Sequence, residues 1–308
     1  MAIPVTIVGG YLGAGKVSLI NHVLTSDHGL RVAVLVNDFG AVNIDASLIA
    51  GRSEDTISLA NGCVCCAIQD DFGDALNAQT QRASPPDHII VEASGVAEPA
   101  RIVTYASALP GVRLDAVVTL VDVETVRRRA NDKFVGTLVR RQLAAADFLV
   151  LNRLDLVSAD AASVVSAWLS THAPTARQVA ARQAEVDAAL LFGATVRAAV
   201  RNASAPAWGG QLSTPFFSVS IELPRHVDLE ALKAALTQLP HSIHRIKGFV
   251  TDLKTGQSML LQCVGNRHAL TPARPDEQAL ARDVLVLIGT VEADVATACD
   301  LLLTIVAG

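Results

Sequence analysis

The chain has 308 residues, of which 51% are hydrophobic and only 4% aromatic. A core built from Ala, Val, Leu and Ile is typical of a parallel sheet covered by helices. The net charge of −5 and the pI near 5.9 argue against a nucleic-acid partner, because nucleic-acid binding needs a basic surface. No apolar run reaches about 18 residues and the first strand begins almost at residue 1, so we expect neither a membrane partner nor a signal peptide. Five cysteines, three of them clustered, do not form the pattern of an oxidised secreted protein, and we therefore expect a cytoplasmic location.

The first part of the chain alternates between apolar runs and Ala-rich amphipathic stretches. Strands are predicted at Ile3–Val8, Val32–Val36, Ile89–Glu92, Ala116–Val121 and Phe148–Leu151. Helices are predicted at Ser18–Leu24, Gly73–Gln81, Glu98–Ala108, Thr125–Ala146 and Ala161–Ser170. This order predicts a doubly wound α/β fold, with a mainly parallel sheet, helices on both faces and ligands at the carboxyl ends of the strands.

Beyond residue 201 the composition changes to Ala, Ser, Gly and Pro, which predicts a linker. We therefore expect one domain over residues 1–200, a linker over 201–214 and a smaller α+β domain over 215–308. In that smaller domain strands are predicted at Phe216–Leu223, Ile243–Leu253, Ser258–Val264 and Val284–Ile288, and helices at Asp228–Leu239 and Glu292–Ile305.

The first predicted strand leads into a glycine-rich loop and then a helix. The loop reads Gly10-Tyr11-Leu12-Gly13-Ala14-Gly15-Lys16, which is G-x-x-x-x-G-K in the strand–loop–helix context where that pattern is specific. Its glycines let backbone amides point at phosphate oxygens, and the helix N-terminus adds a partial positive charge. We expect the phosphates of a nucleotide to be bound by Gly10, Gly13, Ala14, Gly15 and Lys16.

The residue after the lysine departs from this pattern. It is normally Ser or Thr, whose hydroxyl binds Mg²⁺, but here it is Val17, followed by Ser18. Valine offers no oxygen to a hard cation. We therefore expect Val17 and Ser18 beside the nucleotide with a weak or altered Mg²⁺ site: either other groups hold the ion, or the protein turns the nucleotide over poorly.

Two further strand ends carry an acid. Asp38 follows the second predicted strand and is a candidate for the metal side of the nucleotide, although taken alone it is more typical of a capped β-turn. Glu92 ends a buried strand, the position of an acid that reaches Mg²⁺ through water, and the Gly95 amide would then face the γ-phosphate. An acid at a strand end is weak evidence by itself, but the upstream loop favours the functional interpretation. The candidate catalytic residues are Lys16, Asp38 and Glu92.

The segment Asn152-Arg153-Leu154-Asp155 resembles the guanine-reading motif N-K-x-D. An aspartate accepts hydrogen bonds from both the ring N–H and the exocyclic amine of guanine, which adenine cannot supply. Arg153 replaces the usual lysine, and its aliphatic stem can still cover the base. The motif therefore predicts that Asn152 and Asp155 bind guanine, which favours GTP over ATP.

Three thiols occupy four consecutive positions, Cys63, Cys65 and Cys66. Thiolates favour zinc, copper(I) and ions of the cobalt and nickel type, and residues 63 and 65 can converge on one ion. Adjacent cysteines point in different directions in most backbones, so a third ligand would need an irregular turn. A redox thiol and buried structural cysteines are the alternatives, but C-x-C-C lacks the spacing of a C-x-x-C redox motif. The cluster therefore favours a metal site over the two alternatives, and Zn²⁺ or Co²⁺ is the metal that we expect there.

Taken together and in this order, these motifs resemble those of the CobW-like family of metal-associated P-loop GTPases. The family patterns G-x-L-G-A-G-K-T-T, N-E-F-G-E, C-x-C-C, E-x-x-G and N-K-x-D are similar to residues 10–18, 37–41, 63–66, 92–95 and 152–155. Further along, R-x-K-G is similar to residues 245–248 and a strand ending in I-G to residues 288–289. The resemblance extends over nearly the whole chain, and C-x-C-C downstream of such a loop is specific.

The resemblance implies GTP binding, slow hydrolysis, metal binding through the thiols and transfer of zinc or cobalt to a client metalloprotein. Three positions differ from the family pattern: Val17, Asp38 in place of Glu, and Ala41 where an acid is common. All three belong to the Mg²⁺ region, while the thiols are intact. The sequence thus predicts a GTP-binding metallochaperone with slow GTPase activity. The alternatives are a catalytically inert nucleotide-sensing module that assists a maturing metalloenzyme, and an ATP-using P-loop enzyme with structural cysteines.

Overall fold

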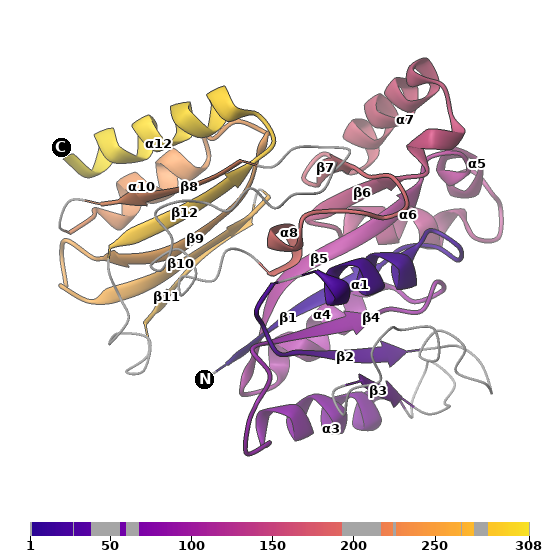
Figure 1. Cartoon of the computed structure of the whole chain (residues 1–308), viewed down its shortest axis with the longest axis horizontal. Helices are drawn as coiled ribbons and strands as arrows, with labels where there is room; N and C mark the ends of the chain where they lie inside the picture. The colour runs from indigo at the N-terminus through magenta and orange to yellow at the C-terminus, as the bar shows by residue number, and fades with distance from the viewer. Residues whose placement is uncertain are drawn as a thin grey trace. The chain divides into compact units, whose positions relative to one another are not determined.

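The structure is a computed structural model. The structure describes residues 2–26, 28–37, 56–59, 68–192, 217–223, 226–265, 267–273 and 283–307. The chain divides into two compact units, Met1–Ala188 and Ala189–Gly308 (Figure 1). Residues 201–214, where we expect a linker, lie outside the described residues, and the domain limits drawn from composition stay a prediction.

The first unit is built on a seven-stranded sheet in the order β3-β2-β4-β1-β5-β6-β7, and every neighbouring pair is parallel. The strands are β1 Ile3–Gly9, β2 Val32–Asn37, β3 Thr56–Leu59, β4 His88–Glu92, β5 Val112–Asp122, β6 Phe148–Asn152 and β7 Arg177–Ala180. Parallel strands that are buried on both faces need continuous apolar runs, and β4 and β6 are buried at every residue. Because β1 lies between β4 and β5, the carboxyl ends of these strands meet at one edge, where ligands bind in doubly wound sheets.

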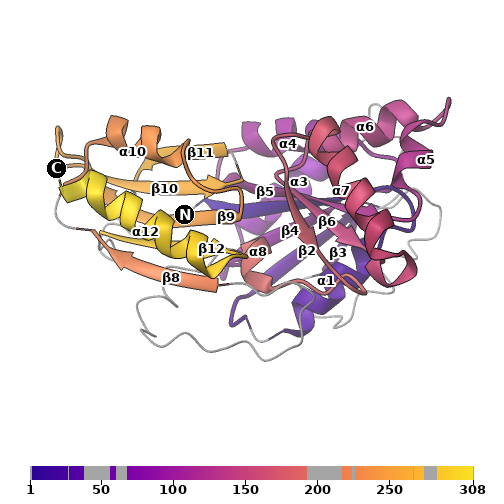
Figure 2. The same cartoon turned by 90° about the horizontal axis from the view of Figure 1, so that it is seen from above.

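Helices cover both faces of this sheet, with α1 on the face opposite α3, α4 and α6 (Figure 2). The helices are α1 Lys16–Thr25, α3 Ile68–Thr80, α4 Pro99–Ala108, α5 Val126–Ala130, α6 Gly136–Ala144 and α7 Ala159–His172, with a 3-10 turn η1 at Leu154–Leu156. On one face Val5 and Ile7 of β1 share an apolar cluster with Phe72 and Leu76 of α3. Because successive side chains of a strand point to opposite faces, the residue between Val5 and Ile7 points to the face that α1 covers.

The single helix expected over Thr125–Ala146 is wrong, because the chain forms two helices there, α5 and α6. Asp132 lies between them and its Oδ1 accepts hydrogen bonds from the backbone N–H groups of Phe134 (2.8 Å) and Val135 (3.1 Å). These two bonds hold the pKa of Asp132 below its usual value. An Asp side chain that bonds to the following amides competes with helix continuation, so the chain turns here.

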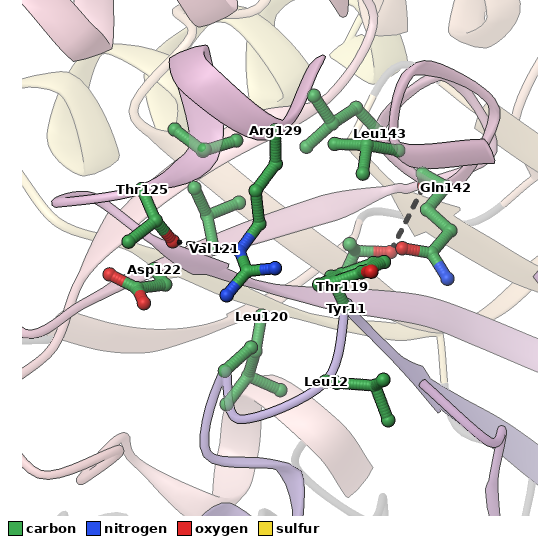
Figure 3. Close-up of a pocket in the computed structure, with 13 residues that line it drawn as sticks. Tyr11, Leu12, Thr119, Leu120, Val121, Asp122, Thr125, Arg129, Gln142 and Leu143 are labelled. Atoms are coloured by element: carbon green, nitrogen blue, oxygen red, sulfur yellow. Dashed lines mark hydrogen bonds between the residues drawn. The ribbon is translucent and has the colours of Figure 1, made fainter. Parts of the chain in front are cut away.

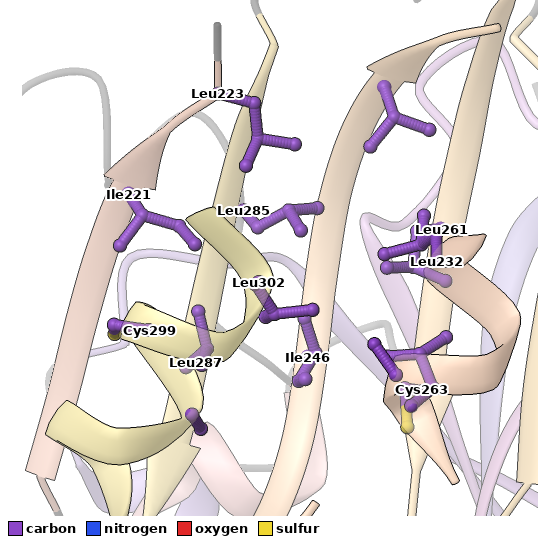
Figure 4. Packing of buried hydrophobic residues seen from close by; sticks show 14 of the residues in the cluster. Ile221, Leu223, Leu232, Ile246, Leu261, Cys263, Leu285, Leu287, Cys299 and Leu302 are labelled. Atoms are coloured by element: carbon purple, nitrogen blue, oxygen red, sulfur yellow. The ribbon is translucent and has the colours of Figure 1, made fainter. Parts of the chain in front are cut away.

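The second unit contains a five-stranded antiparallel sheet in the order β11-β10-β9-β12-β8. Its elements are β8 Phe217–Glu222, α10 Leu229–Leu236, β9 Ile243–Thr251, β10 Ser258–Val264, β11 Arg267–Pro272, β12 Val284–Gly289 and α12 Glu292–Ala307; the short helix α8 Ala188–Phe192 spans the division between the units. One apolar cluster joins side chains of the sheet, such as Ile246 and Leu285, to Leu232 of α10 and Leu302 of α12 (Figure 4). A parallel α/β unit followed by a smaller α+β unit confirms the predicted fold class.

Candidate nucleotide-binding site

The glycine-rich loop lies at the carboxyl end of β1 and ends at the start of α1. Gly10 and Gly15 have φ values of 131° and 107°, in the region that side chains rarely adopt. A Cβ on Gly10 would come within 2.6 Å of the carbonyl oxygen of Leu120 in β5, and a Cβ on Gly15 within 2.6 Å of Nδ2 of Asn152. The loop therefore follows the sheet edge closely, and only glycine fits at these two points.

Lys16 and Glu92, two of the predicted catalytic residues, are brought together by the ends of β1 and β4. Lys16 Nζ lies 3.9 Å from Glu92 Oε1 and donates a hydrogen bond to the carbonyl oxygen of Gly10 at 3.3 Å. The side chains are only 7% and 2% exposed, so each charge compensates the other in a place where an isolated charge would be costly. This pair forms a compact charged centre beneath the loop, in reach of a phosphate bound there.

The first turn of α1 carries the departure from the usual loop. Val17 is half-buried and Ser18 is exposed, and no acidic residue lies in this turn. The position where a magnesium-binding hydroxyl is normal thus presents an isopropyl group. The donor set at the helix start fits a phosphate, through backbone amides and Lys16, but offers no side-chain oxygen at residue 17.

Asn152, at the end of β6, connects the loop to the segment after β7. Its side chain is buried, its Nδ2 donates to the carbonyl oxygen of Ala14 at 2.9 Å, and its Oδ1 accepts from the backbone N–H of Ala184 at 2.8 Å. The sequence did not indicate this role, because the partners Ala14 and Ala184 are distant from Asn152 in sequence. Asp155 lies in η1 with an exposed side chain. Within the motif, Asn152 is therefore engaged with the protein backbone, while the carboxylate of Asp155 is accessible.

Arg153, which replaces the usual lysine, reinforces the same loop. It has a left-handed backbone (φ 64°), an uncommon conformation for a residue other than glycine. Its Nη2 donates to the carbonyl oxygen of Gly13 at 2.8 Å, and its Nη1 forms an ion pair with Asp122 Oδ2 at 3.0 Å. The two terminal nitrogens of the guanidinium thus connect the loop to the end of β5. A lysine has a single side-chain nitrogen and is less suited to making both contacts.

Gly95, predicted to face the γ-phosphate, lies against the glycine-rich loop. A Cβ at Gly95 would come within 2.8 Å of the backbone nitrogen of Leu12. The loop and the segment after β4 are therefore in direct backbone contact, as expected if both reach one phosphate group.

A small cavity lies beside the loop, between the end of β5 and the helices α5 and α6 (Figure 3). Arg129 of α5 places its guanidinium carbon 4.6 Å from the centre of the Tyr11 ring, and its Nε donates to Thr125 Oγ1 at 3.3 Å. The cavity has a volume of about 20 Å³, which is enough for about one water molecule. It is part of the packing that supports the loop rather than a second ligand pocket.

Several predicted site residues lie outside the described residues, namely Asp38, Cys63, Cys65 and Cys66. Across the ranges that the structure describes, no three His, Cys, Asp or Glu side chains gather as a metal site. Over the same ranges, no helix has the length and apolarity needed to cross a membrane. The thiol site therefore stays a prediction from the sequence.

The glycine-rich loop after β1, the lysine at the start of α1 and the buried acid at the end of β4 define a P-loop nucleotide-binding fold. A family model described as CobW/HypB/UreG, nucleotide-binding domain, matches residues 4–180, and one described as cobalamin synthesis protein cobW C-terminal domain matches residues 216–303. The chain belongs to the CobW/HypB/UreG family, which confirms the resemblance inferred from its motifs.

Two relatives are similar to this chain over most of its length. The zinc chaperone CobW of Sinorhizobium sp is 31% identical over 309 aligned residues, covering 86% of this chain and 86% of that protein. The zinc chaperone CobW of Pseudomonas aeruginosa is 33% identical over 305 residues, covering 86% of this chain and 81% of that protein. The solved structure of the Zn(II)-bound YjiA GTPase from E. coli aligns over 99% of each chain, with 20% identity and a TM-score of 0.48.

Proposed function

We propose that this protein is a GTP-binding metallochaperone of the cytoplasm that delivers zinc or cobalt to a client metalloprotein and hydrolyses GTP slowly. The observation that best supports nucleotide binding is the buried Lys16–Glu92 pair beside the glycine-rich loop. Asn152 of the guanine-type motif is hydrogen-bonded to the same loop. The metal half is supported by the C-x-C-C sequence and by two relatives named zinc chaperones.

In this proposal the phosphates are bound by Lys16 and by the amides of Gly13 and Gly15, and Gly95 donates its amide to the γ-phosphate. Nζ of Lys16 would move from the carbonyl of Gly10 to a phosphate oxygen, which keeps its charge compensated. The carboxylates of Glu92 and Asp38 would hold water in the Mg²⁺ shell. That ion, when bound, neutralises charge on the phosphates.

Guanine is selected in this proposal by Asp155. Its exposed carboxylate accepts hydrogen bonds, so it matches the ring N–H and the exocyclic amine of guanine and finds no such pair on adenine. Asn152 supports the site by fixing the loop, since its amide is engaged with Ala14 and Ala184.

The metal cargo in this proposal is bound by Cys63, Cys65 and Cys66. Thiolates prefer zinc and cobalt(II) in tetrahedral sulfur-rich geometry, and the reducing cytoplasm keeps them available. The cargo would pass from these thiols to the ligands of the client.

A second candidate function is favoured by Val17. A catalytically inert module that senses nucleotide while it assists a maturing metalloenzyme needs the phosphate loop but not the magnesium hydroxyl, and the chain retains the first and lacks the second.

The guanine assignment is tested by titrating GTP and ATP into the full-length protein side by side. We expect GTP to bind more tightly than ATP. Asp155→Asn should lower the affinity for GTP by about 10- to 100-fold and leave the affinity for ATP unchanged, because a charge-assisted pair of hydrogen bonds to guanine is lost. Asp160→Asn is the matched control, since Asp160 is exposed in the nearby first turn of α7 and should leave both affinities unchanged. Tighter binding of ATP than of GTP by the wild type contradicts the guanine assignment.

A further inference from the structure

Gln142 of α6 is a buried polar residue that the sequence analysis did not single out. It is 2% exposed, and its Nε2 donates hydrogen bonds to two carbonyl oxygens, those of Gly95 at 3.1 Å and Ala97 at 2.9 Å. A side-chain amide carries two N–H groups, and both are used on one short segment of backbone. Buried amides that satisfy backbone carbonyls in this way fix the segment they contact.

The segment that Gln142 contacts is the turn after β4. The backbone N–H of Ala97 donates to the carbonyl oxygen of Ser94 at 2.9 Å, which closes a turn with Gly95 and Val96 at its centre. Glu92, the buried partner of Lys16, lies two residues before this turn begins at Ser94.

The turn is held by two neighbours. Gly95 lies against the backbone of Leu12 in the glycine-rich loop, where a Cβ would be only 2.8 Å from the Leu12 nitrogen. Gln142, which lines the same small cavity as Leu12, bonds to the carbonyl oxygens of Gly95 and Ala97. The Gln142 backbone is itself anchored, because its carbonyl oxygen accepts from Thr119 Oγ1 of β5 at 3.2 Å. A shift of the turn away from the loop and from Gln142 would therefore break both amide hydrogen bonds.

We propose that Gln142 is a positioning residue that holds the Ser94–Ala97 turn against the glycine-rich loop and thereby sets the discrimination between GTP and GDP. This inference rests on the proposed function, in which the Gly95 amide donates to the γ-phosphate. The γ-phosphate is the part of GTP that GDP lacks, so a turn held in place favours GTP, and a released turn removes that preference while the β-phosphate contacts of Lys16 and the loop persist.

The test compares the affinity of the full-length protein for a non-hydrolysable GTP analogue and for GDP. Gln142→Met keeps the length of the side chain and removes both donors. We expect this variant to lower the affinity for the GTP analogue by about tenfold, a loss consistent with two net hydrogen bonds, and to change the affinity for GDP by less than about twofold. Gln142→Asn, whose shorter arm cannot reach both carbonyls, should give the same shift and carries the test if the Met variant does not fold.

The control is Arg141→Gln. The neighbouring Arg141 forms an exposed ion pair with Glu98 at 2.8 Å, just beyond the same turn, and exposed pairs contribute little. This variant should keep the wild-type ratio of the two affinities. If both Gln142 variants keep the wild-type ratio of the two affinities, including by losing affinity for both nucleotides equally, the positioning role is wrong. A wild type that binds no guanine nucleotide overturns the proposed function itself, and this result appears before any variant is made.

Discussion

Replacing Cys65 with alanine is expected to remove most of the thiolate-to-cobalt charge-transfer absorption when Co²⁺ is titrated into the protein. Cys65 is the middle thiol of the predicted cluster, and with Cys63 it forms the pair that can converge on one ion. A tetrahedral site that loses a thiolate loses a charged, soft ligand, so the metal affinity should fall by at least about 100-fold, a loss of about 2.7 kcal/mol in binding free energy. The near-ultraviolet band and a chelator competition measure the two effects.

Cys263→Ala is the control for this experiment. Cys263 is buried in the apolar cluster of the second unit and is not part of the predicted C-x-C-C cluster, so its replacement should leave the proposed metal site intact. It should change thermal stability through lost packing but leave the cobalt band unchanged. If Cys65→Ala titrates like the wild type, the cluster is structural and the chaperone proposal fails.

Val17→Thr is expected to raise the rate of GTP hydrolysis and to make it depend steeply on Mg²⁺. The change replaces a methyl group by a hydroxyl at nearly constant volume, at the position where P-loop proteins bind the ion. A factor of ten in rate corresponds to about 1.4 kcal/mol of barrier, and one restored metal ligand is expected to supply about one or two such factors. GTP affinity in the absence of Mg²⁺ should not change, because the loop amides and Lys16 do not need the hydroxyl. Turnover measured over a range of Mg²⁺ concentrations tests this.

Val17→Ala separates the added hydroxyl from the removed isopropyl group. It makes room without adding a ligand, so its turnover should stay near that of the wild type. If the wild type already hydrolyses GTP with a steep Mg²⁺ requirement and Val17→Thr alters neither property, then Ser18 or Asp38 supplies the ligand and the interpretation of Val17 is incorrect.

Local patterns were sufficient to predict the elements that carry the site. The apolar run that forms β1, the glycines of the loop and the apolar run of β4 that ends in Glu92 are each a local pattern of a few residues, and the loop has a backbone requirement that only glycine readily meets. The sheet edge follows from the parallel topology, which brings these strand ends together.

The contacts that support the site were not predictable in the same way. Asn152 bonds to Ala184, which follows the unpredicted strand β7. That strand has only four residues, too few for a clear period. Gln142 lies in a stretch that read as one continuous helix, and its partners Gly95 and Ala97 are distant in sequence. A buried glutamine has no sequence signal of its own, because the same residue is usually on the surface.

We propose that a chaperone of this kind couples its metal affinity to the bound nucleotide, and measuring zinc affinity in two nucleotide states tests this most directly. The thiols Cys63 to Cys66 lie in sequence between Asp38 and Glu92, the two acids proposed for the Mg²⁺ shell, so rearrangement around the γ-phosphate should reach them. Chelator competition with saturating non-hydrolysable GTP analogue and with saturating GDP should give zinc affinities that differ by at least about fivefold, the lower end of typical coupling between two sites. Equal affinities in the two states would contradict the account, because GTP hydrolysis would then have no means of driving metal transfer.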